Sequence, residues 1–182
     1  MSLIIKESER PAFQLPSDKT HQAVCYNVWN LGWQKVTFKG HSKAQHKIRI
    51  GWELNEQVRE GKFAGKRLTI SKRYTASLFE RSALYKDLIA WRGRSFSPDE
   101  LDGFDLENLI GANCLMAIVH NQKQDKEYAN ISAIIHLPDG ITSMEPENPR
   151  MTPDWIRNEI ENKLTEEEAK GLNEVQSNGE DE

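Results

Sequence analysis

The sequence has little cysteine and no long apolar run, and both shortages narrow the class of protein. Only two cysteines, Cys25 and Cys114, occur in 182 residues, and each lies in an apolar, strand-like stretch. We expect buried free thiols, as is usual in the cytoplasm, rather than a disulfide or a metal pair. No window approaches the ~18 apolar residues that a membrane span needs, and the N-terminal residues lack the layout of a secretion signal. We therefore expect a cytoplasmic protein without a membrane segment.

Motifs for a metal, a phosphate loop or a catalytic site are also missing. The histidines have neither a paired cysteine nor a second histidine at helical spacing, as zinc sites use. Residues 61–67 are one residue too short for a phosphate loop and lack its Ser or Thr. The acids from Asp99 to Glu107 fit a calcium loop badly, because both its end positions hold no ligand, and helix capping explains them better. We expect no enzyme, metal or cofactor; a metal-dependent nuclease using Asp99 or Asp105 is the less favoured alternative.

Charge is unevenly distributed along the chain. The formal net charge is −4, but residues 139–182 hold 13 acids and 4 bases, a net of −9. This leaves 15 acids and 20 bases in residues 1–138, a net of +5. A basic body with an acidic C-terminal part indicates a protein that binds a polyanion, although many acidic tails have no binding role.

Alternating hydrophobicity predicts strands in the first half of the chain. Residues 22–39 form one long strand with Gly32 in its middle, which is typical of a bulge or bend. A turn at Leu31-Gly32 would split this strand, but its flanks supply no turn chemistry. Residues 46–55 and 66–78 form the second and third strands. The apolar face of the second strand consists of Ile48, Ile50, Trp52 and Leu54.

The second half mixes helices with two more strands. Apolar residues recur at helical spacing over residues 80–92, and Gly93 follows as a stop. Residues 97–100 have the pattern of a helix start with a capping box, and Asp105 can cap a further short turn. Strands are expected at 113–121 and 128–137. An amphipathic helix is expected from Thr152 to about residue 163.

This order of elements predicts a mainly β fold with helices, of the α+β class. Three strands, a helix and two strands is the order of the OB-fold, a five-stranded Greek-key barrel. We expect an extended, poorly ordered N-terminal arm at residues 1–20 and the barrel domain at 21–138. A linker and appended helix follow at 139–170, and an acidic disordered tail at 171–182.

Several segments resemble a family of small replication-region proteins of bacteriophages and prophages, many of which are regarded as single-stranded-DNA-binding proteins. The segments are QAVCYNVWNLGWQ (22–34), KIRIGWEL (47–54), ISKRYTASL (70–78), KDLIAWRGRSF (86–96), GFDLENLIG (103–111), CLMAIVHN (114–121) and YANISAIIHLP (128–138). The resemblance implies an OB-type fold and a role in phage DNA replication or recombination in the bacterial host. It carries no set of binding residues. The acidic tail is similar to tails that recruit replication enzymes, but those commonly end in an aromatic or apolar residue, and this chain ends in Glu182.

Binding of single-stranded DNA requires cations along the phosphates and flat side chains that stack on bases, at ~1–3 kcal/mol per base. The stretch from Trp33 to Tyr74 supplies both, and three strand segments place cations on one expected face. A run of cations is usually only a solvated face, but its repetition on three strands favours a site. The predicted nucleic-acid-binding residues are Trp33, Lys35, Phe38, Lys39, Lys43, Lys47, Arg49, Arg67, Arg73 and Tyr74. Further possible contributors are Trp29, Lys62, Phe63, Lys66 and Lys72.

Packing competes with binding as the role of each aromatic residue. Trp52 shares a face with isoleucines and Trp91 lies on a helical apolar stripe, so both are expected in the core. Trp155 is expected to dock the appended helix, and Trp29 fits either role. Trp33 and Phe38 flank the bend and the basic loop, so stacking and packing are about equally favoured for them.

We predict sequence-tolerant binding of single-stranded DNA. The alternative is an OB-type module that bridges replication or recombination proteins through the appended helix and the tail. Pairing of an exposed strand edge could form a homo-oligomer, and the sequence does not distinguish DNA from RNA.

Overall fold

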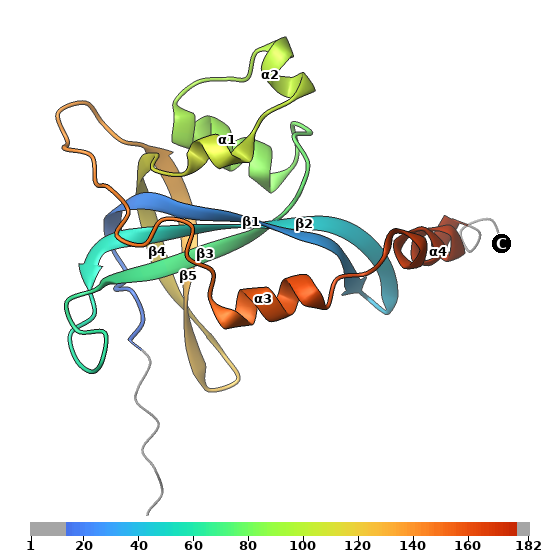
Figure 1. Cartoon of the computed structure of the whole chain (residues 1–182), viewed down its shortest axis with the longest axis horizontal. Coiled ribbons are helices and arrows are strands. Elements are labelled where there is room, and N and C mark those ends of the chain that lie inside the picture. The colour runs from blue at the N-terminus through green and yellow to red at the C-terminus, as the bar shows by residue number, and fades with distance from the viewer. Residues whose placement is uncertain (1–13, 178–182) are drawn as a thin grey trace, which may run out of the picture.

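A computed structural model describes residues 14–177, which form a bent antiparallel sheet with helices at its edges and on one face (Figure 1). The strands are β1 (Thr20–Phe38), β2 (His41–Gln57), β3 (Arg67–Thr75), β4 (Asn113–Lys123) and β5 (Lys126–His136). The helices are α1 (Ala83–Arg92), α2 (Pro98–Asp102), the short 3₁₀ helix η1 (Leu106–Leu109), α3 (Asp154–Glu161) and α4 (Glu166–Ser177). The predicted α+β class with a mainly β body is confirmed.

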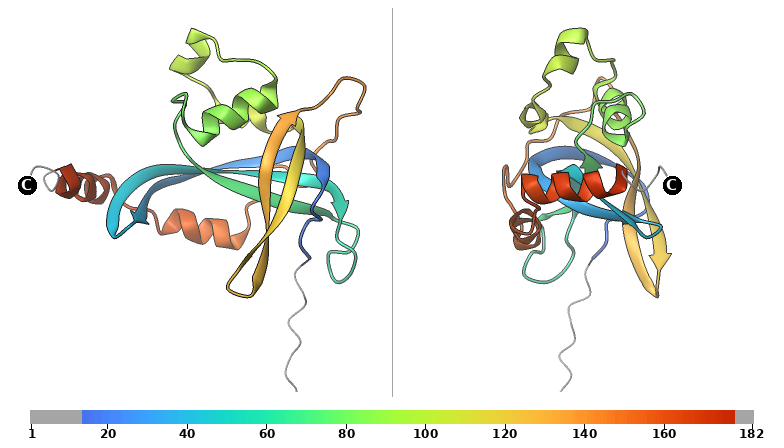
Figure 2. Two further views of the ribbon diagram at one scale, coloured as in Figure 1. Left: turned by 180° about the vertical axis from the view of Figure 1, so that it is seen from behind. Right: turned by 90° about the vertical axis from the view of Figure 1, so that its right-hand side faces the viewer.

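The five strands follow the order β3-β2-β1-β4-β5, and every pairing is antiparallel. β1 pairs with β2 over nearly its whole length, while only its first residues, Thr20–Val24, pair with β4. The β4–β5 hairpin therefore crosses the layer of β1–β3 steeply (Figure 2). Within residues 14–177, β3 and β5 are the two edges without a ladder between them, and α1 contacts both.

The predicted bend at Gly32 is present. The register between β1 and β2 shifts between Asn30 and Gly32, and Gly32 has φ +68°, which glycine adopts without steric cost. The strand continues to Phe38, so the alternative turn at Leu31-Gly32 is wrong. A second register shift lies between Cys25 and Asn27.

The main core fills the concave side of the sheet beneath α1. The four apolar residues predicted for the second strand are buried there. Trp91 lies 5.5 Å from Trp52, ring centroid to ring centroid, and its Nε1 donates to the carbonyl of Asn113. The core positions predicted for both tryptophans are confirmed. The predicted free thiols are confirmed as well, and burial raises the pKa of Cys25 to about 12.

Helix capping accounts for the acidic stretch after α1. Ser97 and Glu100 form the predicted capping box, and Asp105 accepts from the backbone N–H of Glu107. The Ser97 backbone hydrogen bond, followed by that from Arg94, lowers the pKa of Glu100 to about 2. In the described part of the chain no group of three or more His, Cys, Asp or Glu side chains is placed to hold a metal ion.

At both ends of the described chain, residues that were expected to be poorly ordered contact the sheet. Residues 171–177 belong to α4, whose Asn173 side chain bonds both the N–H and the carbonyl of Ala44 on β2. Near the other end, Ser17 donates its backbone N–H and its hydroxyl to Glu56. The remainder of these two expectations lies in residues 1–13 and 178–182, outside the described residues. Among residues 14–177 no helix is long and apolar enough to cross a membrane.

Candidate nucleic-acid interface

An aromatic and two basic residues form one row across the outer face of β1–β3, the face turned away from the main core. Register places Trp29 of β1 opposite Arg49 of β2, and Arg49 opposite Arg73 of β3. Directly opposed residues share one face of a sheet, and like charges in that position are destabilising. This row therefore needs an anion.

Glu159 of α3 supplies the anion. Its Oε2 lies 3.3 Å from Arg49 Nη2, and its Oε1 lies 3.1 Å from Arg73 Nε. The guanidinium of Arg49 also lies 4.9 Å from the ring centroid of Trp155, one turn earlier in α3. Arg49 Nε is nevertheless buried without a hydrogen-bond partner among the described residues. One carboxylate therefore neutralises the row without satisfying every donor in it.

We define the cover as residues 145–164, which run along this outer face and include α3 (Figure 1). Ile156 is fully buried against Tyr26, Trp29 and Leu31, which form a second, smaller core. Trp29 Nε1 donates to Thr152 Oγ1 at 3.0 Å. Ile156 makes the buried contact that docks the helix, while Trp155 is 52% exposed and contacts the sheet through Arg49.

Glycine at position 51 makes room for the aromatic part of this face. A Cβ there would lie 2.6 Å from Trp29 Cη2 and 2.8 Å from Tyr26 Cε1. Both rings can therefore lie over the backbone of β2 only because the residue beneath them has no side chain.

The first part of the cover is anchored by a buried carboxylate, Glu53. It accepts the backbone N–H groups of Glu147 and Asn148 at 2.7 and 2.8 Å, and Arg67 Nη1 lies 3.4 Å away. Arg67 also lies 3.5 Å from a carboxylate oxygen of Glu147. Arg67, predicted to contact nucleic acid, is bound here by three acceptors of the chain, including the carbonyl of Glu145, and its contact with nucleic acid stays a prediction.

Beyond the sheet, β1 and β2 continue as a two-stranded projection, which we call the hairpin arm: residues 33–46, with its turn at Lys39-Gly40. β3 begins to pair with β2 only at Lys47. The exposed residues of the arm that sequence predicted for binding are Lys35, Phe38, Lys39 and Lys43. Phe38 is 69% exposed, with Lys39 Nζ 5.4 Å from its ring centroid. The arm therefore offers cations and a flat ring to solvent.

Lys47 connects the arm to the row of arginines. It shares a strand face with Lys43 and Arg49, and its Nζ donates to Thr75 Oγ1 at 2.7 Å. Partial burial, then repulsion by Arg73 and by Lys43, lowers its pKa. The cations of β2 thus form a continuous line from the arm to α3.

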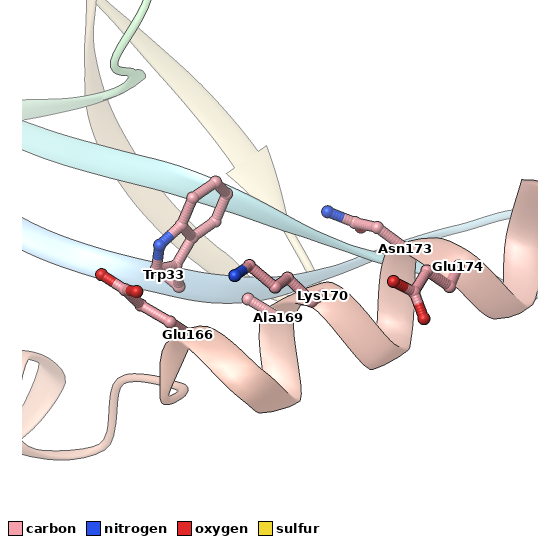
Figure 3. Close-up of a pocket in the computed structure, with 6 residues that line it drawn as sticks. All are labelled: Trp33, Glu166, Ala169, Lys170, Asn173 and Glu174. Atoms are coloured by element: carbon pink, nitrogen blue, oxygen red, sulfur yellow. The ribbon is translucent and has the colours of Figure 1, made fainter.

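Trp33 lies on the other face of the arm, beside α4. Its ring stacks on His46 at 5.6 Å, and its carbonyl accepts the N–H of Leu164. It also lines a pocket with residues of α4 (Figure 3). The lining residues from α4 are Glu166, Ala169, Lys170, Asn173 and Glu174. The carboxylates of Glu166 and Glu174 disfavour binding of a phosphate at this pocket. Trp33 therefore lies apart from the line of cations on β2.

Tyr74 is the clearest correction among the predicted site residues. It is 3% exposed, and its hydroxyl donates to Asp87 at 2.8 Å. Burial, followed by the charge of Asp87, raises its pKa. Leu68 and Ile70 lie six and four residues before it and so share its face of β3, which could have identified it as a core residue despite Lys72 between them.

The structure places Trp29, a possible contributor by sequence, in the row of Arg49 and Arg73 and adds Glu159, which pairs with both arginines. Local sequence held no sign of the contact between Arg49 and Glu159, which are 110 positions apart. No family model and no curated protein matches this chain.

Proposed function

We propose that the protein binds single-stranded DNA without sequence preference, through the hairpin arm and the adjoining outer face of β2 and β3. The hairpin arm is the observation that carries this proposal. Lys35, Lys39 and Lys43 are exposed and have no ion-pair partner within residues 14–177. Phe38 shares a face of the arm with Lys43 and lies next to Lys39, so it can stack on a base while these two lysines follow the phosphates. Lys35 lies on the opposite face of the arm and adds positive charge there.

We further propose that the sheet is of the OB type. Its strand order, with α1 between β3 and β4 in the chain and packed against both edges, agrees with a five-stranded barrel that is open between β3 and β5. OB-folds bind oligonucleotides on the face of strands 2 and 3 and on the loops between strands 1 and 2 and between strands 4 and 5. The hairpin arm is this first loop, greatly lengthened. The resemblance to phage and prophage proteins supports action in DNA replication or recombination in the cytoplasm of a bacterial host.

The test is a titration of fluorescently labelled oligo-dT that is longer than ~16 nucleotides, the upper end of the range that one OB-fold covers. We expect anisotropy to rise with protein at low salt and tryptophan fluorescence to be quenched. The logarithm of affinity should fall with the logarithm of salt by ~0.7 per phosphate contact, because counterions are released. No change in anisotropy or fluorescence at low salt would contradict the proposal, and a parallel titration with oligo-rU compares DNA with RNA.

A protein-interaction role is the second candidate, favoured by the outer edge of β5, which pairs with no further strand within residues 14–177. Tyr128 and Ile135 on this strand are 46% and 48% exposed, and an unpaired strand edge can add a strand from another chain. That chain is a second copy in a homo-oligomer, or a replication or recombination protein that also contacts the acidic C-terminal part. Light scattering across a range of concentrations tests the homo-oligomer, and a monomer throughout contradicts it.

A further inference from the structure

Beneath α3 lies a group of side chains with the composition of a nucleic-acid subsite. Trp29 supplies an aromatic ring, and Arg49 and Arg73 supply adjacent guanidinium groups in the same cross-strand row. Trp29 is 4% exposed, and the two arginines are paired with Glu159. The subsite is therefore complete but occupied by the chain itself.

We propose that α3 is a replaceable lid over a second single-stranded-DNA subsite formed by Trp29, Arg49 and Arg73, in which Glu159 takes the place of a backbone phosphate. This inference rests on the proposed function, because DNA bound to the hairpin arm is what reaches the row. The occupant is single-stranded DNA because an aromatic ring next to paired arginines matches a base next to its phosphate.

The electrostatics favour exchange of Glu159 for a phosphate. A phosphate group accepts hydrogen bonds through more than one oxygen and suits the forked guanidinium of arginine. Arg49 Nε, which is buried without a partner in the described structure, would gain an acceptor. A base on Trp29 would replace the apolar contact that Ile156 gives up when α3 leaves.

The covalent path of the cover permits such movement. Residues before Pro153 are held by Glu53, and Asn27 donates its side-chain amide to the carbonyl of Met151. After Pro153 the contacts are mostly made by side chains: Ile156 and Ile160 pack on the sheet, and Glu159 pairs with the arginines. Gln34 Nε2 also donates to the carbonyl of Glu159, and Leu164 donates its N–H to the carbonyl of Trp33. α3 can therefore swing away while the first part of the cover stays in place.

The first experiment compares two acids of α3 in the full chain. Glu159→Gln removes the bridging charge, whereas Glu161→Gln removes an exposed charge that pairs with no basic residue in the described chain. Both variants change the net charge equally. We expect Glu159→Gln to bind oligo-dT about three- to tenfold more tightly than wild type, and Glu161→Gln to stay close to wild type.

The second experiment locks the lid. A Cβ at Gly32 would lie 3.4 Å from Lys163 Cβ, close to the separation that a disulfide spans. In Gly32→Cys/Lys163→Cys, the oxidised protein holds α3 down and the reduced protein releases it. We expect oxidation to weaken oligo-dT binding by about tenfold, the value of one stacked base. Gly32→Cys alone carries the same backbone strain and should not respond to oxidation, since Cys25 and Cys114 are buried.

These experiments separate the inference from the proposed function. If wild type binds oligo-dT but Glu159→Gln equals Glu161→Gln, or the oxidised clamp equals the reduced one, the lid is overturned and DNA binding by the arm stands. If wild type and all variants fail to bind at low salt, DNA binding and the lid are both overturned. Circular dichroism and thermal melting of each variant exclude unfolding as the cause.

Discussion

The part of β2 in the hairpin arm and the part in the sheet carry cations in the same alternation, but these cations differ in exposure and pairing. At the arm end, Lys43 is exposed and unpaired in the described structure, while at the sheet end Arg49 is half-buried and bound to Glu159. A pattern of cations in the sequence therefore predicts which face of a sheet carries positive charge. It does not predict whether an acidic side chain of the same protein already pairs with that charge.

Spacing explains the difference. Lys43 and Lys47 are four residues apart, ~13 Å along an extended strand, which exceeds the Debye length of ~8 Å at physiological salt. Their repulsion is accordingly the smallest of the three causes that lower the pKa of Lys47. Arg49 and Arg73 face each other across neighbouring strands at ~5 Å. Only the second arrangement requires an anion, and α3 provides one.

The largest expected effect comes from replacing Glu53, which anchors the cover at the sheet part of β2. Glu53→Gln leaves one oxygen as acceptor and turns the other into a donor that faces backbone N–H groups and Arg67. We expect unfolding by urea to show a loss of ~3–5 kcal/mol, because a buried charge network loses one partner. Glu60→Gln, an exposed acid of the β2–β3 loop, serves as the control and should change stability by less than ~0.5 kcal/mol. A loss below ~1 kcal/mol for Glu53→Gln would mean that the anchor is dispensable.

Overfilling the space under the aromatic rings should have the next largest effect. Gly51→Ala places a Cβ 2.6 Å from Trp29 Cη2, so the ring and α3 above it must shift. We expect a loss of ~1–3 kcal/mol in urea unfolding and a changed near-UV circular dichroism spectrum. Gly103→Ala is the matched control, since a Cβ there meets open space. Equal stability of the two variants would show that the rings do not depend on Gly51.

The arm is tested by its charges. Lys35→Gln/Lys39→Gln/Lys43→Gln should reduce the salt slope of oligo-dT binding by ~2, at ~0.7 per lost phosphate contact. Stability should stay unchanged, because these side chains are exposed. Arg81→Gln/Lys86→Gln removes exposed cations from the helical region after β3 as a control. If the salt slope falls by the same amount per removed charge in both variants, the hairpin arm is not a specific contact site for DNA.

The smallest expected effect on stability comes from Glu100, a carboxylate distant from the arm, and this effect should depend on pH. Glu100, whose pKa is lowered to about 2 by the Ser97 backbone N–H and by Arg94, stabilises the fold at neutral pH. Because its folded pKa lies below the unfolded value, this stabilisation is present above pH ~4.5 and is lost as pH falls towards 2. Glu100→Gln should therefore be less stable than wild type at pH 7, and the gap should narrow at pH 3. A gap that stays constant in urea unfolding at both pH values would contradict the assignment.

Local pattern was sufficient for much of the fold. The alternation of β2, the bulge at Gly32, the capping box at Ser97 and the stop at Gly93 each depend on neighbours within a few residues, and all were predictable. The helix expected from Thr152 to about residue 163 is α3, whereas α4, Glu166–Ser177, was not predicted as a separate helix because its sequence is polar. It is held through Ala169 and Asn173 against the distant hairpin arm, a contact that no local pattern contains.

The sequence by itself determined that basic residues line one face of β2 and β3 and continue into an exposed arm, because a strand turns alternate side chains to the same side. The expected third contribution, from β1, is wrong, because register places Lys35 opposite Ala44, on the face of Trp33. Only the tertiary structure decided which of them stay free. Arg49 and Arg73 come to face each other through strand register, and Glu159 reaches them from 110 positions beyond Arg49. Charge neutralisation over that separation depends on where a helix packs, and the packing of Ile156 on Trp29 and Leu31 fixes that place.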